Sequence, residues 1–130
     1  MYLVDTNVVS ELMRPRPQAS VARFVGELSR FSVSVITLEE LWFGLALRRS
    51  DRLLAWLDRL VADCCDVLPV TATIARRSAE LRGVLRASGK TRTQADMLIA
   101  ATAVEHQLSV VTRNRRDFDG CGVRVIDPFQ

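Results

Sequence analysis

Four acidic side chains could form a metal site at one edge of a sheet. Asp5 comes directly after a short apolar run, Glu40 follows a second run, and Asp117 lies a few residues after a third. Asp96 begins a long apolar helix, whose end could turn this acid toward the same edge. Carboxylates gathered there would repel one another unless a cation neutralised them. Oxygen ligands without Cys or His indicate a hard metal, Mg²⁺ or Mn²⁺, which can activate water and hold a phosphodiester for in-line attack.

Each of these acids also has a purely structural explanation. Asp5 could be the N-cap of the first helix. The segments 37–40 and 93–96 fit a capping box, in which an acid follows a threonine by three residues, and the segment 114–117 has the same spacing. The helix dipole also favours an acid in a first turn. The metal interpretation therefore depends on the convergence of all four acids.

Soft-metal and disulfide chemistry fit the sequence poorly. The chain has three cysteines, two of them adjacent, no Cys-x-x-Cys and a single histidine, His106. These counts exclude the usual zinc patterns and argue against a disulfide framework. They also exclude a metal-free ribonuclease that uses a pair of histidines.

The elements that must position the acids alternate along the chain. Apolar runs predict strands over residues 2–4, 31–36, 67–70, 109–112 and 123–126. Helical spacing predicts helices over residues 7–13, 21–28, 37–49, 53–60, 74–88 and 94–106. Strands separated by helices predict an α/β fold with a parallel sheet, in which sites lie beyond the carboxyl ends of the strands. The almost continuous apolar middle of 94–106 predicts a helix buried on most sides.

Length and composition predict a single domain. The chain has 130 residues, 48% of them hydrophobic and 25% charged, which is normal for a globular protein. No apolar run approaches the length of a membrane span, and the first residues lack the layout of a signal peptide. We therefore expect no membrane association and a location in the cytoplasm.

Four segments together resemble the motifs of one family. They read VDTNVVSEL over residues 4–12, SVITLEEL over 34–41 with Gly44 after it, ADMLIAATA over 95–103 and VTRNRRDF over 111–118. In this order and spacing the chain resembles PIN-domain ribonucleases. It is most similar to the VapC toxins of type II toxin–antitoxin pairs, particularly their FitB-like subgroup.

The resemblance implies a PIN fold over residues 1–130, a parallel sheet flanked by helices and an acidic pocket for Mg²⁺, with Mn²⁺ as a possible substitute. It implies an endoribonuclease that inhibits translation or growth and is neutralised by a VapB-type antitoxin. By this resemblance, the metal-binding and catalytic positions of the family correspond to Asp5, Glu40 and Asp96. The fourth acid stands at the position of Asn114 in some relatives and of Asp117 in others; we favour Asp117 as the acid. Side chains that would order the pocket through hydrogen bonds are Thr6, Asn7, Thr112 and Asn114.

Basic and aromatic residues suggest where partners would bind. Eight basic residues near the acids could guide an RNA backbone, namely Arg14, Arg16, Arg86, Lys90, Arg92, Arg113, Arg115 and Arg116. Arg115 and Arg116 are the predicted phosphate contacts, although ordinary solvated surface explains each base alone. Trp42 and Phe43 are adjacent on a predicted helix and cannot point the same way, so one of them could face a partner. We expect a homodimer that forms a heterotetramer or a larger assembly with its antitoxin.

Other functions fit the sequence less well. Haloacid-dehalogenase-like phosphatases carry a second aspartate two residues after the first, where this chain has Asn7. Response-regulator receivers use a late-strand lysine, whereas Lys90, the only lysine, precedes the buried helix. A PIN domain that cuts DNA, a general RNA-processing nuclease and a non-catalytic PIN module stay as alternatives. The sequence does not name the RNA that would be cut.

Overall fold

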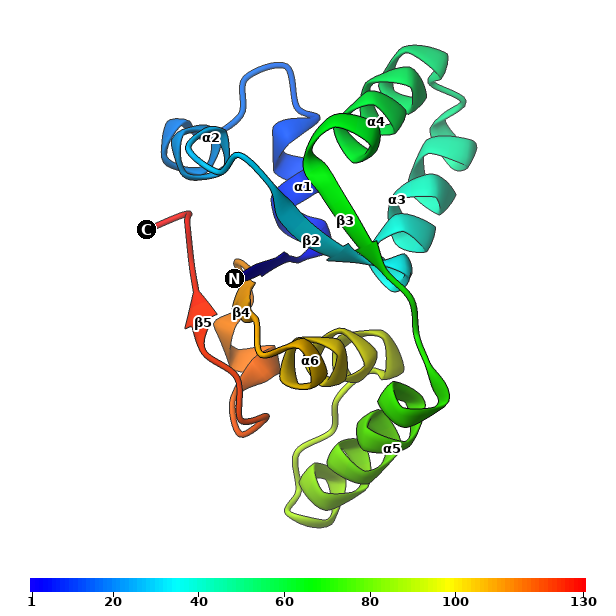
Figure 1. Cartoon of the computed structure of the whole chain (residues 1–130), viewed down its shortest axis with the longest axis vertical. Helices are drawn as coiled ribbons and strands as arrows, with labels where there is room; N and C mark the ends of the chain where they lie inside the picture. Colours follow the sequence, from blue (N-terminus) through cyan, green and yellow to red (C-terminus); the bar gives the residue numbers. More distant parts are fainter.

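The computed structural model describes all residues, 1–130, as an alternation of strands and helices (Figure 1). The strands are β1 (Tyr2–Val4), β2 (Phe31–Ser34), β3 (Cys65–Leu68), β4 (Ser109–Val111) and β5 (Val125–Ile126). The helices are α1 (Thr6–Leu12), α2 (Ala19–Gly26), α3 (Val35–Arg48), α4 (Asp51–Cys64), α5 (Ala72–Ala87), α6 (Gln94–His106) and the short 3₁₀-helix η1 (Arg115–Phe118).

All neighbouring strands of the five-stranded sheet are parallel, in the order β3-β2-β1-β4-β5. The chain moves outward from β1 to β2 and β3, then returns to the other side of β1 for β4 and β5. The strand order therefore reverses between β1 and β4. In an open α/β sheet, this is the point at which the loops beyond the strands separate and leave room for a site. The predicted α/β fold with a parallel sheet is confirmed.

Two hydrophobic cores cover the two faces of the sheet. Successive residues of a strand point to opposite faces, and the two fully buried residues Leu3 and Val4 of β1 join different cores. The core around Val4 includes apolar residues of α1, α2, α3 and α4. The core around Leu3 includes residues of α5, α6 and η1. Figure 1 shows α5 and α6 together on one side of the sheet and α3 and α4 on the other.

Helix α6 is buried on most sides, as the apolar middle of its sequence predicts. Its bounds, Gln94–His106, agree with the predicted range. It begins at Thr93, whose side chain accepts a hydrogen bond from the backbone N–H of Asp96. A helix packed between the sheet and α5 holds its first turn in a fixed place, which matters because Asp96 lies there.

The predicted boundary between the second strand and its helix was wrong. Strand β2 ends at Ser34, and α3 begins at Val35 rather than at Thr37. The Ser34 hydroxyl accepts from the backbone N–H of Ile36 at 3.0 Å and so caps the helix. The β-branched residues Val35 and Ile36 look like strand residues, but the cap overrides that preference. Glu40 therefore lies in the second turn of α3, and Thr37 does not form the predicted capping box with it.

Other strand and helix boundaries also differ from the predicted ones. Strand β3 begins at Cys65, directly after α4, because Cys65 already pairs with Phe31 of β2. Strand β5 comprises only Val125 and Ile126. Asn114 precedes η1 without a capping hydrogen bond from its side chain, so the predicted box at 114–117 is absent. None of the helices combines the length and apolar character needed to cross a membrane.

Candidate active site

Asp5 lies directly beyond β1 and is held there by its backbone and its side chain. Its N–H donates to the carbonyl of Val111, which extends the pairing of β1 with β4. Its carboxylate accepts from the N–H of Thr6 at 2.8 Å and so caps α1. The side chain is only 4% exposed. Asp5 is thus an N-cap, and the same position puts its charge at the edge where β1 and β4 end.

A network of polar side chains holds the second carboxylate oxygen of Asp5. The hydroxyl of Thr112, which follows β4, donates to Asp5 Oδ2 at 2.8 Å, and the amide of Asn7 donates to the same atom at 3.1 Å. Asn7 also donates to the Thr112 hydroxyl. The backbone N–H groups of Arg113 and Asn114 donate to Asn7 and Thr112 respectively. These contacts tie the loop after β4 to the start of α1.

Glu40 reaches the site through Thr6. The Thr6 hydroxyl donates to Glu40 Oε1 at 2.6 Å and also lies 3.2 Å from the hydroxyl of Thr37. Thr37 is fully buried on the side of α3 that faces α1. Glu40 itself is exposed, one turn further along α3. The contact between α1 and α3 therefore orients an otherwise solvated carboxylate.

The three carboxylates of Asp5, Glu40 and Asp96 line one hollow of about 540 Å³ at this edge. No hydrophobic residue lines it. The other lining residues are Thr6, Asn7, Ser10, Glu11, Arg14, Arg113 and Asn114. The hollow contains four acids and two arginines, and every potential metal ligand in it is an oxygen or an amide group.

Burial and like charges raise the pKa values of two of these acids. Burial is the main cause that raises the pKa of Asp5 to about 6, and the charges of Asp96 and Glu40 act in the same direction against the hydrogen bonds from Thr112 and Thr6. Burial also raises the pKa of Asp96, with further contributions from the charges of Asp117 and Glu40. The carboxylates are therefore close enough to repel one another, and a cation would relieve that repulsion.

Asp117 and the two predicted phosphate-binding arginines lie at the margin of the site. Asp117 does not line the hollow, although its charge reaches Asp96. Its backbone carbonyl accepts from the Arg92 guanidinium at 2.6 Å, which holds η1 against the loop before α6. Arg115 donates to the carbonyl of Val125, and Arg116 is exposed. Neither arginine lines the hollow, whereas Arg14 and Arg113 do.

Glu11 lines the hollow and was not among the predicted site residues. It is 7% exposed, accepts from the backbone N–H of Gln18 at 2.8 Å and pairs with Arg14 at 3.3 Å. The Gln18 N–H is the main cause of its lowered pKa. Asn7 and Glu11 are four residues apart, which places them on one face of α1, and Arg14 follows just beyond the end of that helix. That spacing was the signal in the sequence that could have found Glu11.

The donor set fits a hard divalent cation that keeps part of its water shell. No three carboxylate, thiol or imidazole side chains are close enough to hold one ion on their own. Mg²⁺ is usually bound by one or two carboxylates plus waters and substrate phosphates, so it does not require such a cage. A soft metal would find no ligand here, because the three cysteines are free and lie outside the hollow.

The PIN domain family matches residues 2–121 of this chain. The chain belongs to the PIN-domain family. It is 34% identical to "VapC ribonuclease Y4jK" of Sinorhizobium fredii over 100% of this chain and 99% of the relative. It is also 34% identical to "Toxin FitB" of Neisseria gonorrhoeae, over 99% of both chains. The predicted resemblance to VapC ribonucleases and to FitB is confirmed.

Solved structures with the same architecture as this chain include two that are at least 25% identical to it. The crystal structure of FitAcB from Neisseria gonorrhoeae superimposes with a TM-score of 0.85 at 32% identity, over 100% of this chain and 99% of the other. A toxin–antitoxin complex from Klebsiella pneumoniae superimposes with a TM-score of 0.78 at 25% identity, over 100% and 99% of the chains. Each of these matches therefore covers nearly the whole length of both chains.

Proposed function

We propose that this PIN-domain chain is the toxin of a type II toxin–antitoxin pair, an endoribonuclease that needs a divalent metal and inhibits translation or growth. The observation that carries the proposal is the convergence of Asp5, Glu40 and Asp96 on one hollow beyond β1 and β4. These acids come from three distant segments, so capping of separate helices does not explain why they meet. The names of the relatives, a VapC ribonuclease and a toxin, support the same activity.

The proposed metal is Mg²⁺, with Mn²⁺ as a substitute, and its proposed ligands are Asp5, Glu40, Asp96 and Asp117. Because no three of these carboxylates are close enough to hold one ion together, one or two would bind it directly and the others would act through its water molecules. When bound, it would activate water and stabilise charge on the phosphodiester. Asp5 is oriented for this role by Thr112 and Asn7. Glu40 is oriented by Thr6. These hydrogen bonds already hold the carboxylates in place, so the carboxylates lose less conformational entropy when the ion binds.

In this assignment Asp117 is the fourth acid, outside the hollow, and Asn114 is a supporting polar residue that lines it. Asn114 lines the hollow, and its backbone N–H donates to Thr112 at 3.1 Å. Asp117 influences the charge state of Asp96 and is fixed through its carbonyl by Arg92. Arg115 and Arg116 stay proposed phosphate contacts outside the hollow, where Arg115 also donates to the carbonyl of Val125.

The proposed protein partner is a VapB-type antitoxin whose basic tail enters the hollow. A guanidinium or ammonium group can pair with carboxylates and replace the charge of the metal. The predicted homodimer is supported by the apolar surface of α3, where Trp42, Phe43 and Leu47 are 46%, 65% and 75% exposed. Two copies joined there and two antitoxins would form a heterotetramer or a larger assembly. Its place of action would be the cytoplasm, where RNA and the antitoxin meet.

Cleavage of RNA by the purified toxin tests the enzymatic part. We expect cleavage with Mg²⁺ or Mn²⁺, none with EDTA, and none with Asp96→Asn, which can keep the helix because Thr93 provides the cap. Asp58→Asn, an exposed acid of α4, is the matched control and should cleave as the parent does. Cleavage that persists in excess EDTA would exclude the metal mechanism. Binding of RNA without cleavage would instead indicate the non-catalytic PIN module.

A further inference from the structure

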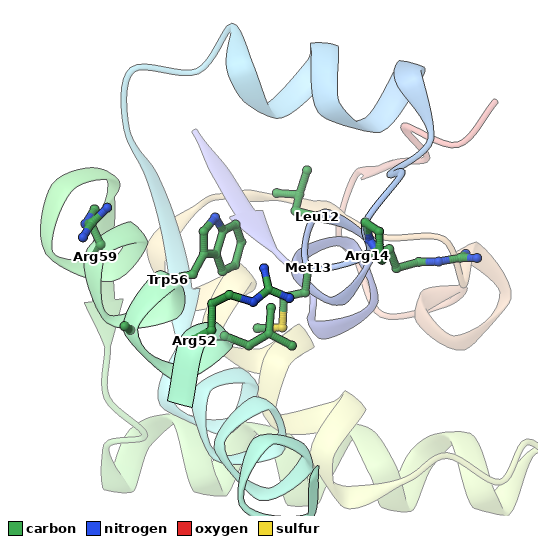
Figure 2. Close-up of a pocket in the computed structure, with 9 residues that line it drawn as sticks. Leu12, Met13, Arg14, Arg52, Trp56 and Arg59 are labelled. Atoms are coloured by element: carbon green, nitrogen blue, oxygen red, sulfur yellow. The ribbon is translucent and has the colours of Figure 1, made fainter. Parts of the chain in front are cut away.

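A second hollow, of about 490 Å³, adjoins the acidic one and has a different chemistry (Figure 2). It lies between the end of α1 and one face of α4. Three arginines and no acid line it, and the other lining residues are apolar. The lining residues that matter here are Leu12, Met13, Arg14, Arg52, Trp56 and Arg59.

The residues from α4 form a stripe along one side of that helix. Arg52, Trp56 and Arg59 are four and three residues apart, the spacing of neighbours on one helical face. Arg52 and Arg59 are exposed, Trp56 is half-buried, and neither arginine forms an ion pair. Figure 2 shows the Trp56 indole and the Arg52 side chain in the middle of the hollow, with Arg59 to one side in this view.

Arg14 connects this hollow to the acidic one. It lines both of them, and its side chain is 67% exposed although it pairs with Glu11. A chain molecule whose backbone bears negative charge could therefore pass from the acids across Arg14 to the stripe on α4. The two hollows have opposite electrostatic character. A negatively charged group of the ligand backbone would need a cation to bind the acids of the first hollow, whereas the next such group could bind the arginines of the second hollow directly.

We propose that this second hollow binds a single-stranded stretch of RNA next to the bond that is cut; this rests on the proposed ribonuclease function. Trp56 stacks on a base, and Arg14, Arg52 and Arg59 bind phosphates on either side of it. Combined stacking and phosphate contacts are the usual way to bind a single strand with little regard to its sequence. A paired helix could not use the indole in this way, because its bases are already stacked on one another.

A charge-matched pair of double variants tests the phosphate contacts. The probe is a fluorescein-labelled oligouridine, and its binding is followed by anisotropy in EDTA, so that no cleavage occurs. Arg52→Gln with Arg59→Gln should weaken binding about tenfold and reduce the slope of log affinity against log salt by about 1.4, the value for two phosphates of a single strand. The control, Arg76→Gln with Arg82→Gln on α5, removes the same charge from the other side of the sheet and should bind as the parent does.

Fluorescence tests the stacking, because the chain has only two tryptophans. In a Trp42→Phe background, Trp56 is the single indole, and saturating oligouridine should quench its emission. With cleavable RNA and Mg²⁺, the Arg52→Gln and Arg59→Gln double variant should raise KM about tenfold and leave kcat within about twofold, because the affected contacts lie outside the acidic hollow.

The possible failures are distinguishable. If the parent cleaves RNA but both double variants weaken binding equally, only the general charge matters and the proposed subsite is wrong. Unquenched Trp56 emission would also overturn it. If the α4 double variant keeps its RNA affinity but no longer binds the antitoxin, the hollow is a protein-docking site. If the parent neither binds nor cleaves RNA, the proposed function fails and this inference fails with it.

Discussion

Replacing Asp5 with asparagine should remove much of the pH dependence of folding stability in metal-free buffer. Burial raises the pKa of Asp5 from 3.8 to about 6 in the folded chain. Because the folded value is the higher one, ionisation at neutral pH opposes folding. The favourable contribution of the protonated group is complete below pH 3.8 and is lost as the pH rises through about 6.

The pKa difference determines the size of this effect. A change from 3.8 to about 6 corresponds to a loss of about 3 kcal/mol of folding free energy at pH above both values. Asparagine does not ionise and avoids this loss. Its amide would, however, place an N–H group against the Asn7 amide that now donates to Asp5 Oδ2. The mismatch should cost about 1–2 kcal/mol at every pH.

The parent and Asp5→Asn stability curves should therefore cross. In acid the variant should be the less stable of the two, and near neutral pH it should equal or exceed the parent. Urea unfolding in EDTA, followed by circular dichroism from acid to neutral pH, measures both curves. Asp58→Asn, at an exposed position on α4, is the control and should follow the parent. Parallel curves for the parent and Asp5→Asn would show that burial does not raise the pKa of this carboxyl, and the electrostatic account would be wrong.

Three further outcomes follow from the same contacts. In EDTA at pH 7, Asp96→Asn should melt at a higher temperature than the parent, because burial and the nearby charges of Asp117 and Glu40 both disfavour the ionised carboxylate. A lower melting temperature would contradict this account. Mg²⁺ at about 100 times its Kd should stabilise the parent by about 2.7 kcal/mol in a thermal-shift assay and Asp5→Asn much less. Glu11→Ala should destabilise the chain by about 1–3 kcal/mol in urea, since the N–H of Gln18 loses its acceptor, whereas Glu11→Gln keeps one.

Much of the fold could be predicted because the relevant signals are local. The apolar middle of α6 is long and almost continuous, whereas the apolar spacing within α5 repeats over several turns. The predicted bounds of both helices agree closely with the structure. The alternation of strands and helices led to the parallel sheet in the same way. The start of α3 failed because two signals competed over a few residues. Val35 and Ile36 favour a strand, and only the hydroxyl of Ser34 starts the helix there.

The candidate site, like the fold, could be predicted from the sequence only in part. Residue types and their order along the chain indicated that Asp5, Glu40 and Asp96 belong together. Asp5 and Glu40 follow parallel strands, whose ends meet at one edge of the sheet, and Asp96 begins a buried helix that could turn it toward that edge. Which neighbours orient them depends on packing. Thr6 and Glu40 are 34 positions apart in the chain, and the hydrogen bond between them exists because α1 lies against α3. No sequence pattern specifies that contact.

The tertiary structure alone decided the surroundings of the acids. The reversal of strand order between β1 and β4 brings Thr112 to Asp5 across 107 positions of the chain. It also leaves Asn114 in the hollow and Asp117 at its margin. Packing also decides which arginines lie at the site. Arg14 and Arg113 line the hollow, whereas Arg115 donates to the carbonyl of Val125. A sequence determines which groups can ionise or donate, whereas distances between segments, and hence pKa values and partners, arise only when helices and strands pack.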